Sequence, residues 1–174
     1  MSNIINEVVL NKAISCAIYF LSIRARSRRE IINKLREKEF SDEIIDKTIQ
    51  DLKNLGYIDD ENFAKLFISD KRRLHQFGNE KLRFDLMRLG VDREIIDKYL
   101  DDEFYETDDD ETELNAAMTA IKKKYKNNID ILKQKEESYK AAVYLKSRGF
   151  SYSIAKEAIK ETIEKIIETE FDGD

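Results

Sequence analysis

Four arginines within six consecutive residues of the sequence could bind an anionic group. They occur in the stretch SIRARSRREIINKL, residues 22–35, and are Arg24, Arg26, Arg28 and Arg29. A guanidinium group presents a planar set of N–H donors that matches the oxygens of carboxylates and phosphates. Arg28 and Arg29 fall in the first turn of a predicted helix, where the positive end of the helix dipole disfavours cations. An anionic partner would offset this cost and could also accept the free N–H groups of the helix.

A solvent-exposed helix face with local ion pairs, for instance to Glu30 or Asp60, is the simpler alternative. Basic residues nevertheless recur further along the chain. A second group comprises Lys71, Arg72, Arg73, Lys81 and Arg83, and a third comprises Lys122, Lys123, Lys124 and Lys126. This recurrence favours an extended anionic partner over one small ligand. The aromatic residues among them are more typical of a core than of base-stacking positions; they are Phe77, Phe84, Tyr125 and Tyr139.

The net charge of the chain conceals these basic regions. The 174 residues carry a formal charge of −5, yet residues 101–113 hold nine acids and no base. Without that stretch the formal charge would be +4. The stretch lacks the ligand order and the central glycine of a calcium-binding loop, so we interpret it as a solvated acidic linker. The rest of the chain is therefore suited to an anionic partner.

The sequence offers little for catalysis or for metal binding. His75 is the single histidine and Cys16 is the single cysteine, which excludes most familiar catalytic and metal-binding combinations. We therefore predict a protein that is not an enzyme and has no metal or cofactor. No apolar run approaches the length of a membrane span, and the N-terminus lacks a signal-peptide pattern. We expect a cytoplasmic monomer that does not bind membranes.

Apolar residues follow a helical period almost throughout the chain, which contains no proline and five glycines. In residues 44–55 the apolar stripe predicts one helix, and Gly56 is placed to end it. The next helix should begin at Asp59 or Asp60 and bury Phe63, Leu66 and Phe67. The sequence thus predicts an all-α protein.

A repeated pattern divides these helices into groups. The segments that correspond are LREKEFSDEIIDK at 35–47, LMRLGVDREIIDK at 86–98 and LKSRGFSYSIAKE at 145–157. In each, a helix ends at a corner residue (Glu39, Gly90 or Gly149), and a polar residue then caps the next helix. Ser27 corresponds to Gly78, and SRRE at 27–30 predicts a capping box.

We therefore predict three tandem three-helix repeats that form an elongated, curved, right-handed helical-repeat body. The expected repeats are residues 1–58, residues 59–106, and residues 107–174 with the acidic linker and tail. A helix-turn-helix that reads a DNA sequence is disfavoured, because Asp42, Glu43 and Asp46 would face phosphates at the start of the recognition helix.

Several of these motifs resemble the RecX family of RecA regulators. They are the pattern A-x3-LS-x-R-x-RS-x-x-E at 17–30, LGYIDDENFA at 55–64, the Gly78 region and SRGFSY at 147–152. Glu39 replaces the glycine that is usual at the first corner. The resemblance implies a non-enzymatic regulator that binds the RecA–DNA filament and suppresses its ATPase, strand-exchange and coprotease activities in DNA repair and the SOS response. It also implies weak, non-specific contacts with single- or double-stranded DNA.

With this resemblance, the arginine cluster and the second basic group become candidate contacts with the RecA surface or with phosphates. Two alternatives remain open. One is a stand-alone, sequence-indifferent DNA-binding regulator that uses the same arginines, and the other is a helical-repeat adaptor between proteins.

Overall fold

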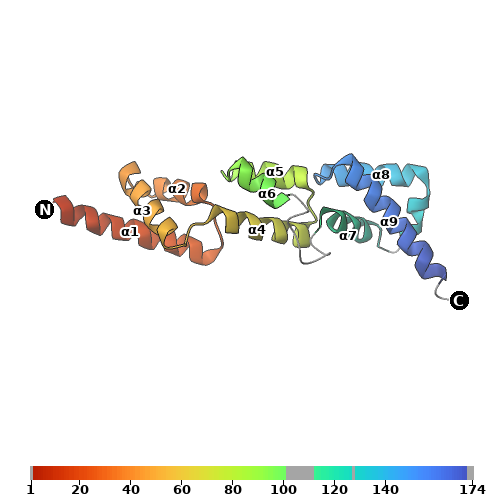
Figure 1. The fold of residues 1–174 in the computed structure, drawn as a ribbon, viewed down its shortest axis with the longest axis horizontal. Helices are drawn as coiled ribbons and strands as arrows, with labels where there is room; N and C mark the ends of the chain where they lie inside the picture. Colours follow the sequence, from red (N-terminus) through yellow and green to blue (C-terminus); the bar gives the residue numbers. More distant parts are fainter. Residues whose placement is uncertain (1, 101–111, 127, 172–174) are drawn as a thin grey trace. The chain divides into compact units, whose positions relative to one another are not determined.

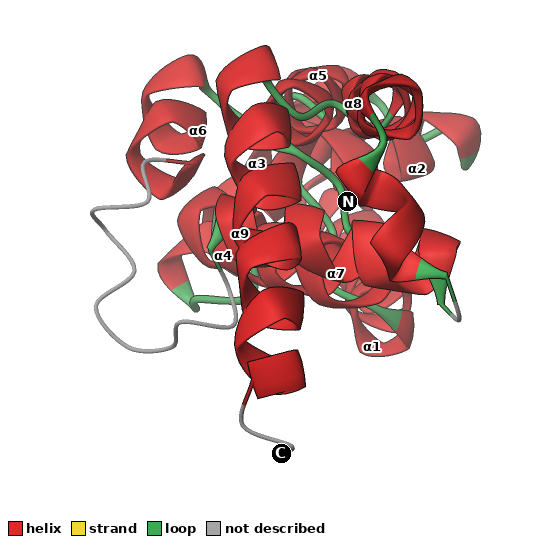
Figure 2. Cartoon of the chain, turned by 90° about the vertical axis from the view of Figure 1, so that its right-hand side faces the viewer, coloured by secondary structure: helices red, strands yellow, loops and turns green. Residues whose placement is uncertain are grey.

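A computed structural model describes residues 2–100, 112–126 and 128–171 of the chain. Within these ranges all regular elements are helices, and no strand occurs (Figure 2). The α-helices are α1 (Ser2–Ile23), α2 (Arg28–Glu37), α3 (Asp42–Asn54), α4 (Asp60–Asp70), α5 (Asn79–Arg88), α6 (Arg93–Leu100), α7 (Glu113–Tyr125), α8 (Lys135–Ser147) and α9 (Tyr152–Phe171). A π-helical turn, Lys71–His75, follows α4, and a 3-10 turn, Ile129–Lys133, precedes α8. The all-α prediction is confirmed.

The chain forms two compact units. The first contains residues 1–66 and 86–96, and the second contains residues 67–85 and 97–174. The division passes through α4, α5 and α6, so the units do not follow the expected repeat boundaries. Those boundaries stay predictions, and residues 106 and 107 lie outside the described residues.

In the first unit, α1, α2 and α3 pack around one small core (Figure 1). Ala13 and Ala17 let the other helices approach α1 closely, and Ile31, Leu35 and Leu52 fill the space between them. The apolar stripe of α3 is buried as its period predicts, except for Leu55, which is 67% exposed. Leu55 follows the last turn of α3, where Gly56 adopts a φ of +74° and ends the helix.

In the second unit, α9 packs against both α7 and α8 (Figure 1). The buried core of these three helices includes Ala117, Ile121, Leu132, Leu145 and Phe150. Within the described ranges, no helix is both long and apolar enough to cross a membrane.

The last two residues of the acidic stretch, Thr112 and Glu113, take part in the start of α7. Residues 101–111 lie outside the described residues, but Thr112 caps α7 by accepting a hydrogen bond from the Asn115 N–H at 3.2 Å. Glu113 is buried, and its carboxylate accepts a hydrogen bond from the Asn79 N–H at 2.7 Å. The expectation of a solvated linker is therefore wrong for these two residues, because both satisfy N–H groups at the start of a helix.

The three corner residues share a left-handed backbone, with φ values of +61° at Glu39, +81° at Gly90 and +86° at Gly149. A side chain at Gly90 would overlap the stem of Arg29, and one at Gly149 would overlap Lys81. Glu39 is exposed instead. The two glycine corners thus lie against a preceding helix, whereas the glutamate corner faces solvent.

Candidate anion-binding surface

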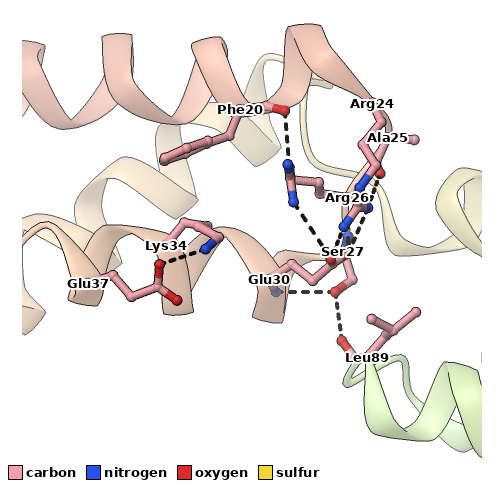
Figure 3. Close-up of polar contacts among 9 residues, drawn as sticks. All are labelled: Phe20, Arg24, Ala25, Arg26, Ser27, Glu30, Lys34, Glu37 and Leu89. Carbon is pink, nitrogen blue, oxygen red and sulfur yellow. Dashed lines mark hydrogen bonds and ion pairs between the residues drawn. The ribbon is translucent and has the colours of Figure 1, made fainter.

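The capping box at Ser27 fixes where α2 begins (Figure 3). Its hydroxyl accepts a hydrogen bond from the Glu30 N–H at 3.2 Å, while the Glu30 carboxylate accepts one from the Ser27 N–H at 3.1 Å. The buried Ser27 hydroxyl also donates to the Leu89 carbonyl at 2.6 Å. The predicted capping box is confirmed, and it also ties α2 to the corner after α5.

Asp60 provides a second acidic contact at the start of α2. Its carboxylate accepts a hydrogen bond from the Arg28 N–H at 2.7 Å. Burial raises the pKa of Asp60, and the charges of Asp92 and Asp59 raise it further, although the Arg28 hydrogen bond and charge act in the opposite direction. The N–H groups of Arg28 and Glu30 are therefore occupied within the chain. The expectation that an external anion accepts them is wrong for these two groups.

Two of the four arginines turn toward the protein (Figure 3). Arg24 forms an ion pair with Glu30 at 2.5 Å, and the Arg26 guanidinium lies 3.8 Å from the same carboxylate. Arg26 also donates to the Phe20 carbonyl at 3.1 Å and lies over the Phe20 ring. These contacts join the end of α1 to the start of α2, so local ion pairing accounts for Arg24 and Arg26.

Arg28 and Arg29 are exposed at the surface, as Arg24 also is. Within the described part of the chain, the guanidinium groups of Arg28 and Arg29 have no ion pair or hydrogen bond. The stem of Arg29 lies against Gly90, which leaves its charged end outside the packed surface. Arg28 and Arg29 are consequently the cations of the cluster that a partner could bind without displacing an internal ion pair.

The surroundings of Arg28 are not uniformly basic. It borders a hollow of about 610 Å³ together with Lys53, and the same hollow is lined by four acids. These acids are Asp59, Asp60, Glu61 and Asp92. The hollow is therefore no pocket for an anion, and an anion must reach Arg28 from its solvent side.

The second predicted group is divided between the interior and the surface. Arg72 is 2% exposed, and its guanidinium donates to the Asn79 side chain at 2.9 Å. Lys71 is half-buried over the Phe67 ring, and Arg73 is exposed 3.4 Å from the Asp70 carboxylate. Arg72 thus supports the start of α5 rather than the molecular surface.

Lys81 and Arg83 lie on α5 and both have acidic neighbours. Lys81 is 3.6 Å from Asp85 and lies over the Phe77 ring, while Arg83 pairs with Asp97. The cluster at residues 24–29 belongs to the first compact unit, and this second group belongs to the second unit.

The third basic group lies near the end of α7. Lys122, Lys123, Lys124 and Lys126 are all exposed, and the Lys124 ammonium lies 4.0 Å from the centre of the Tyr144 ring. Positive charge is favourable there, because the last turn of a helix is the negative end of its dipole.

The expectation for the interleaved aromatics is wrong at two positions. Phe84 is 64% exposed and Tyr139 is 70% exposed, whereas Phe77 and Tyr125 are half-buried. Helical periodicity identifies neither residue as exposed, because burial depends on which other helix covers the position.

Sequence reasoning also missed the role of Arg148. Its guanidinium donates to the Gln76 carbonyl at 3.0 Å and to the His75 carbonyl, and it lies over the Phe77 ring. The segment SRGFSY contains this arginine, but its partners lie some seventy residues earlier in the chain. Only the fold brings them together.

In the described ranges, no group of histidine, cysteine or acidic side chains could hold a metal ion. The described elements, helices grouped in three-helix sets, define the chain as an all-α helical-repeat protein. Its sequence matches the domains described as "RecX, first three-helix domain" at residues 13–52 and "RecX, second three-helix domain" at residues 59–100.

Individual relatives agree with these matches over most of their length. The chain is 37% identical to the regulatory protein RecX of Finegoldia magna over 160 residues, which are 90% of this chain and 74% of that protein. It is also 37% identical to the regulatory protein RecX of Chlorobium phaeobacteroides, covering 89% of this chain and 93% of the relative. The chain belongs to the RecX family.

Solved structures support the same fold. The crystal structure of RecX from Lactobacillus salivarius superposes with a TM-score of 0.71 at 24% identity, over 88% of this chain and 96% of that one. A second crystal structure, of a regulatory protein RecX, gives a TM-score of 0.69 at 22% identity, over 94% of this chain and 75% of that one.

Proposed function

We propose that this protein is a non-enzymatic regulator that binds the RecA–DNA filament and reduces the ATPase, strand-exchange and coprotease activities of RecA. Membership of the RecX family is the observation that carries the proposal, because its relatives are named regulatory proteins. A regulator of this kind acts in the cytoplasm as a monomer and needs no cofactor. It binds through many surface contacts, and linking weak contacts on one chain multiplies their effect.

Arg28 and Arg29 make the leading contacts with RecA carboxylates or with DNA phosphates. Their guanidinium groups are exposed and form no ion pair within the described part of the chain, although the charge of Arg28 acts to lower the pKa of Asp60. Binding to them therefore breaks no internal ion pair. Contacts with DNA alone are weak, indifferent to sequence and reduced by salt.

The remaining predicted residues have graded roles. Lys71, Arg73, Lys81 and Arg83 contribute less, because each already lies on an aromatic ring or beside an acid. Arg24, Arg26 and Arg72 position the elements that carry the contacts, because their guanidinium groups bind within the chain.

The DNA-dependent ATPase of RecA on single-stranded DNA tests this proposal. The variant Arg28→Glu/Arg29→Glu should need about tenfold or more protein for the same inhibition, which corresponds to about 1.4 kcal/mol. The control Lys38→Glu/Lys47→Glu makes the same charge change at exposed positions of the same unit and should inhibit as the unchanged protein does. Thermal unfolding monitored by circular dichroism verifies that both variants fold.

Three results would contradict the proposal or a part of it. If the unchanged protein binds duplex DNA but leaves the ATPase unaffected, the stand-alone DNA-binding regulator is correct. If it does neither, the adaptor alternative gains support. Inhibition that survives in Arg28→Glu/Arg29→Glu would preserve the function and reject these two residues as its leading contacts.

A further inference from the structure

An apolar groove of about 620 Å³ lies between α8 and α9. Its floor is formed by Ala142 of α8 and by Ile159, Ile163 and Ile167 of α9. The isoleucines recur at intervals of four residues, so they form one stripe along α9. None of the groove residues belongs to the cationic groups described above.

Two tyrosines extend this apolar surface into solvent. Tyr139 is 70% exposed and Tyr152 is 69% exposed, and both line the groove. Contiguous exposed apolar surface with a polar rim is typical of interaction sites. Tyrosine suits such a site, because its ring provides apolar area while its hydroxyl stays hydrated.

The rim of the groove is mainly positive. Lys135, Lys156 and Lys160 line it together with a single acid, Glu164. Lys160 lies 3.6 Å from Glu164, whereas Lys135 and Lys156 have no ion pair within the described ranges. A ligand with acids beside its apolar face would therefore complement this rim.

We propose that this groove binds an acidic amphipathic helix of a protein partner. From Tyr152 to Ile167 the lining of α9 extends about 22 Å, enough for about four turns of a bound helix. The apolar face of the partner covers the isoleucine stripe, and its acids lie beside the lysines. The inference goes beyond the proposed function and does not depend on it.

Other occupants fit the groove less well. Single-stranded nucleic acid would stack on the tyrosines, but the aliphatic floor of Ala142, Ile159 and Ile163 offers no ring for successive bases. A second copy of this groove would bring two lysine rims together, and their like charges would repel.

The test uses the full chain and a synthetic, fluorescein-labelled peptide of about sixteen residues, with leucines on one helical face and glutamates on the other. Fluorescence polarisation measures its affinity beside that of a peptide in which lysines replace the glutamates. The acidic peptide should bind at least about tenfold more tightly. Tyr139→Glu should weaken its binding at least about tenfold, because the new charge faces both the apolar floor and the acids of the peptide.

Val143→Glu is the matched control, since Val143 is an exposed residue of α8 outside the groove lining. It should bind the acidic peptide as the unchanged protein does. Equal binding of the acidic and basic peptides, or equal loss in both variants, would overturn the proposal. So would displacement of the acidic peptide by oligo-dT, or self-association abolished by Tyr139→Glu in sedimentation experiments. Circular dichroism confirms that both variants are folded.

Discussion

The start of α2 and the start of α5 are each joined to later segments by two corresponding hydrogen bonds, although their sequences differ. An acid from a later helix accepts the first N–H in each case: Asp60 from Arg28 at 2.7 Å, and Glu113 from Asn79 at 2.7 Å. The residue just before each helix also donates a hydrogen bond to the carbonyl of the residue that precedes a corner glycine, Gly90 or Gly149. This carbonyl is that of Leu89 in the first unit and that of Arg148 in the second.

The two junctions differ in the group that donates to this carbonyl. The first unit uses the Ser27 hydroxyl, whereas the second uses the Gly78 backbone N–H at 3.0 Å. The main-chain contact places Gly78 so close to Gly149 and Phe150 that a side chain would overlap their backbone atoms. The comparison explains why a serine and a glycine occupy corresponding positions: one junction leaves room for a side chain and the other does not.

Among the substitutions that test this comparison, replacement of Gly78 should lower the stability most. In Gly78→Ala the new methyl group meets backbone atoms, which cannot rotate away. We expect the free energy of unfolding to fall by about 3 kcal/mol or more, measured by urea denaturation. Gly56→Ala is the control: its methyl group would meet open space, so it should lose only the roughly 1 kcal/mol that a φ of +74° costs an alanine. If both variants lose the same stability, close backbone packing is not the reason for Gly78.

Gly90→Ala should cost less, about 2 kcal/mol in urea denaturation. The alanine must adopt a φ of +81°, which costs about 1 kcal/mol, and it displaces the flexible stem of Arg29. Combining it with Arg29→Ala should recover part of the loss. Strict additivity of the two substitutions would contradict packing between Arg29 and Gly90.

Ser27→Ala tests the junction in the first unit, where a side-chain hydroxyl donates to the corner carbonyl. It removes the cap of α2 and leaves the Leu89 carbonyl without its donor. The expected loss is about 1–2 kcal/mol in thermal or urea unfolding. Ser41→Ala provides the comparison, because the Ser41 hydroxyl caps α3 through the Ile44 N–H and is exposed. Equal losses in the two variants would mean that the contact with Leu89 contributes nothing.

Glu39→Gly should stabilise the protein by about 0.5–1 kcal/mol. Glycine accepts the φ of +61° without the steric cost that glutamate bears, and the exposed Glu39 side chain has no packing to lose. The midpoint of urea denaturation measures the change. A lower midpoint would show that the glutamate side chain stabilises its corner.

The smallest expected effect is the contribution of Asp60 to the pH dependence of stability. Because the pKa of Asp60 is raised in the folded state, folding favours its protonated form. Its contribution to stability should therefore decline as the pH rises from about 4 through the raised pKa. Asp60→Asn retains an acceptor for the Arg28 N–H but cannot titrate, so its stability relative to the unchanged protein should increase over this range. Urea denaturation at several pH values measures the difference, and a constant difference would reject the raised pKa.

Local patterns predicted much of the fold. The burial of Ile45, Ile49 and Leu52 follows from helical period, and the capping box at Ser27 follows from residue types three positions apart. The turn at Gly56 has a similarly local cause, since glycine readily adopts positive φ.

The candidate site was less predictable, because it depends on residues distant in sequence. Nothing near Arg72 in the chain distinguishes it from Arg73, yet Arg72 is buried against Asn79 while Arg73 is exposed. Glu113 likewise belongs to an acidic run in the sequence, yet its carboxylate lies at the start of α5. Periodicity identifies a helical face but not the helix that covers it.

The glutamate at the first corner has a consequence for how such a chain could grow by duplication. A further three-helix set added upstream would place its own helix start against residue 39, as α2 lies against Gly90 and α5 lies against Gly149. The side chain of Glu39 would obstruct that contact. A glycine at position 39 would remove this obstruction, so the choice between glutamate and glycine decides whether this corner has room for another helix start.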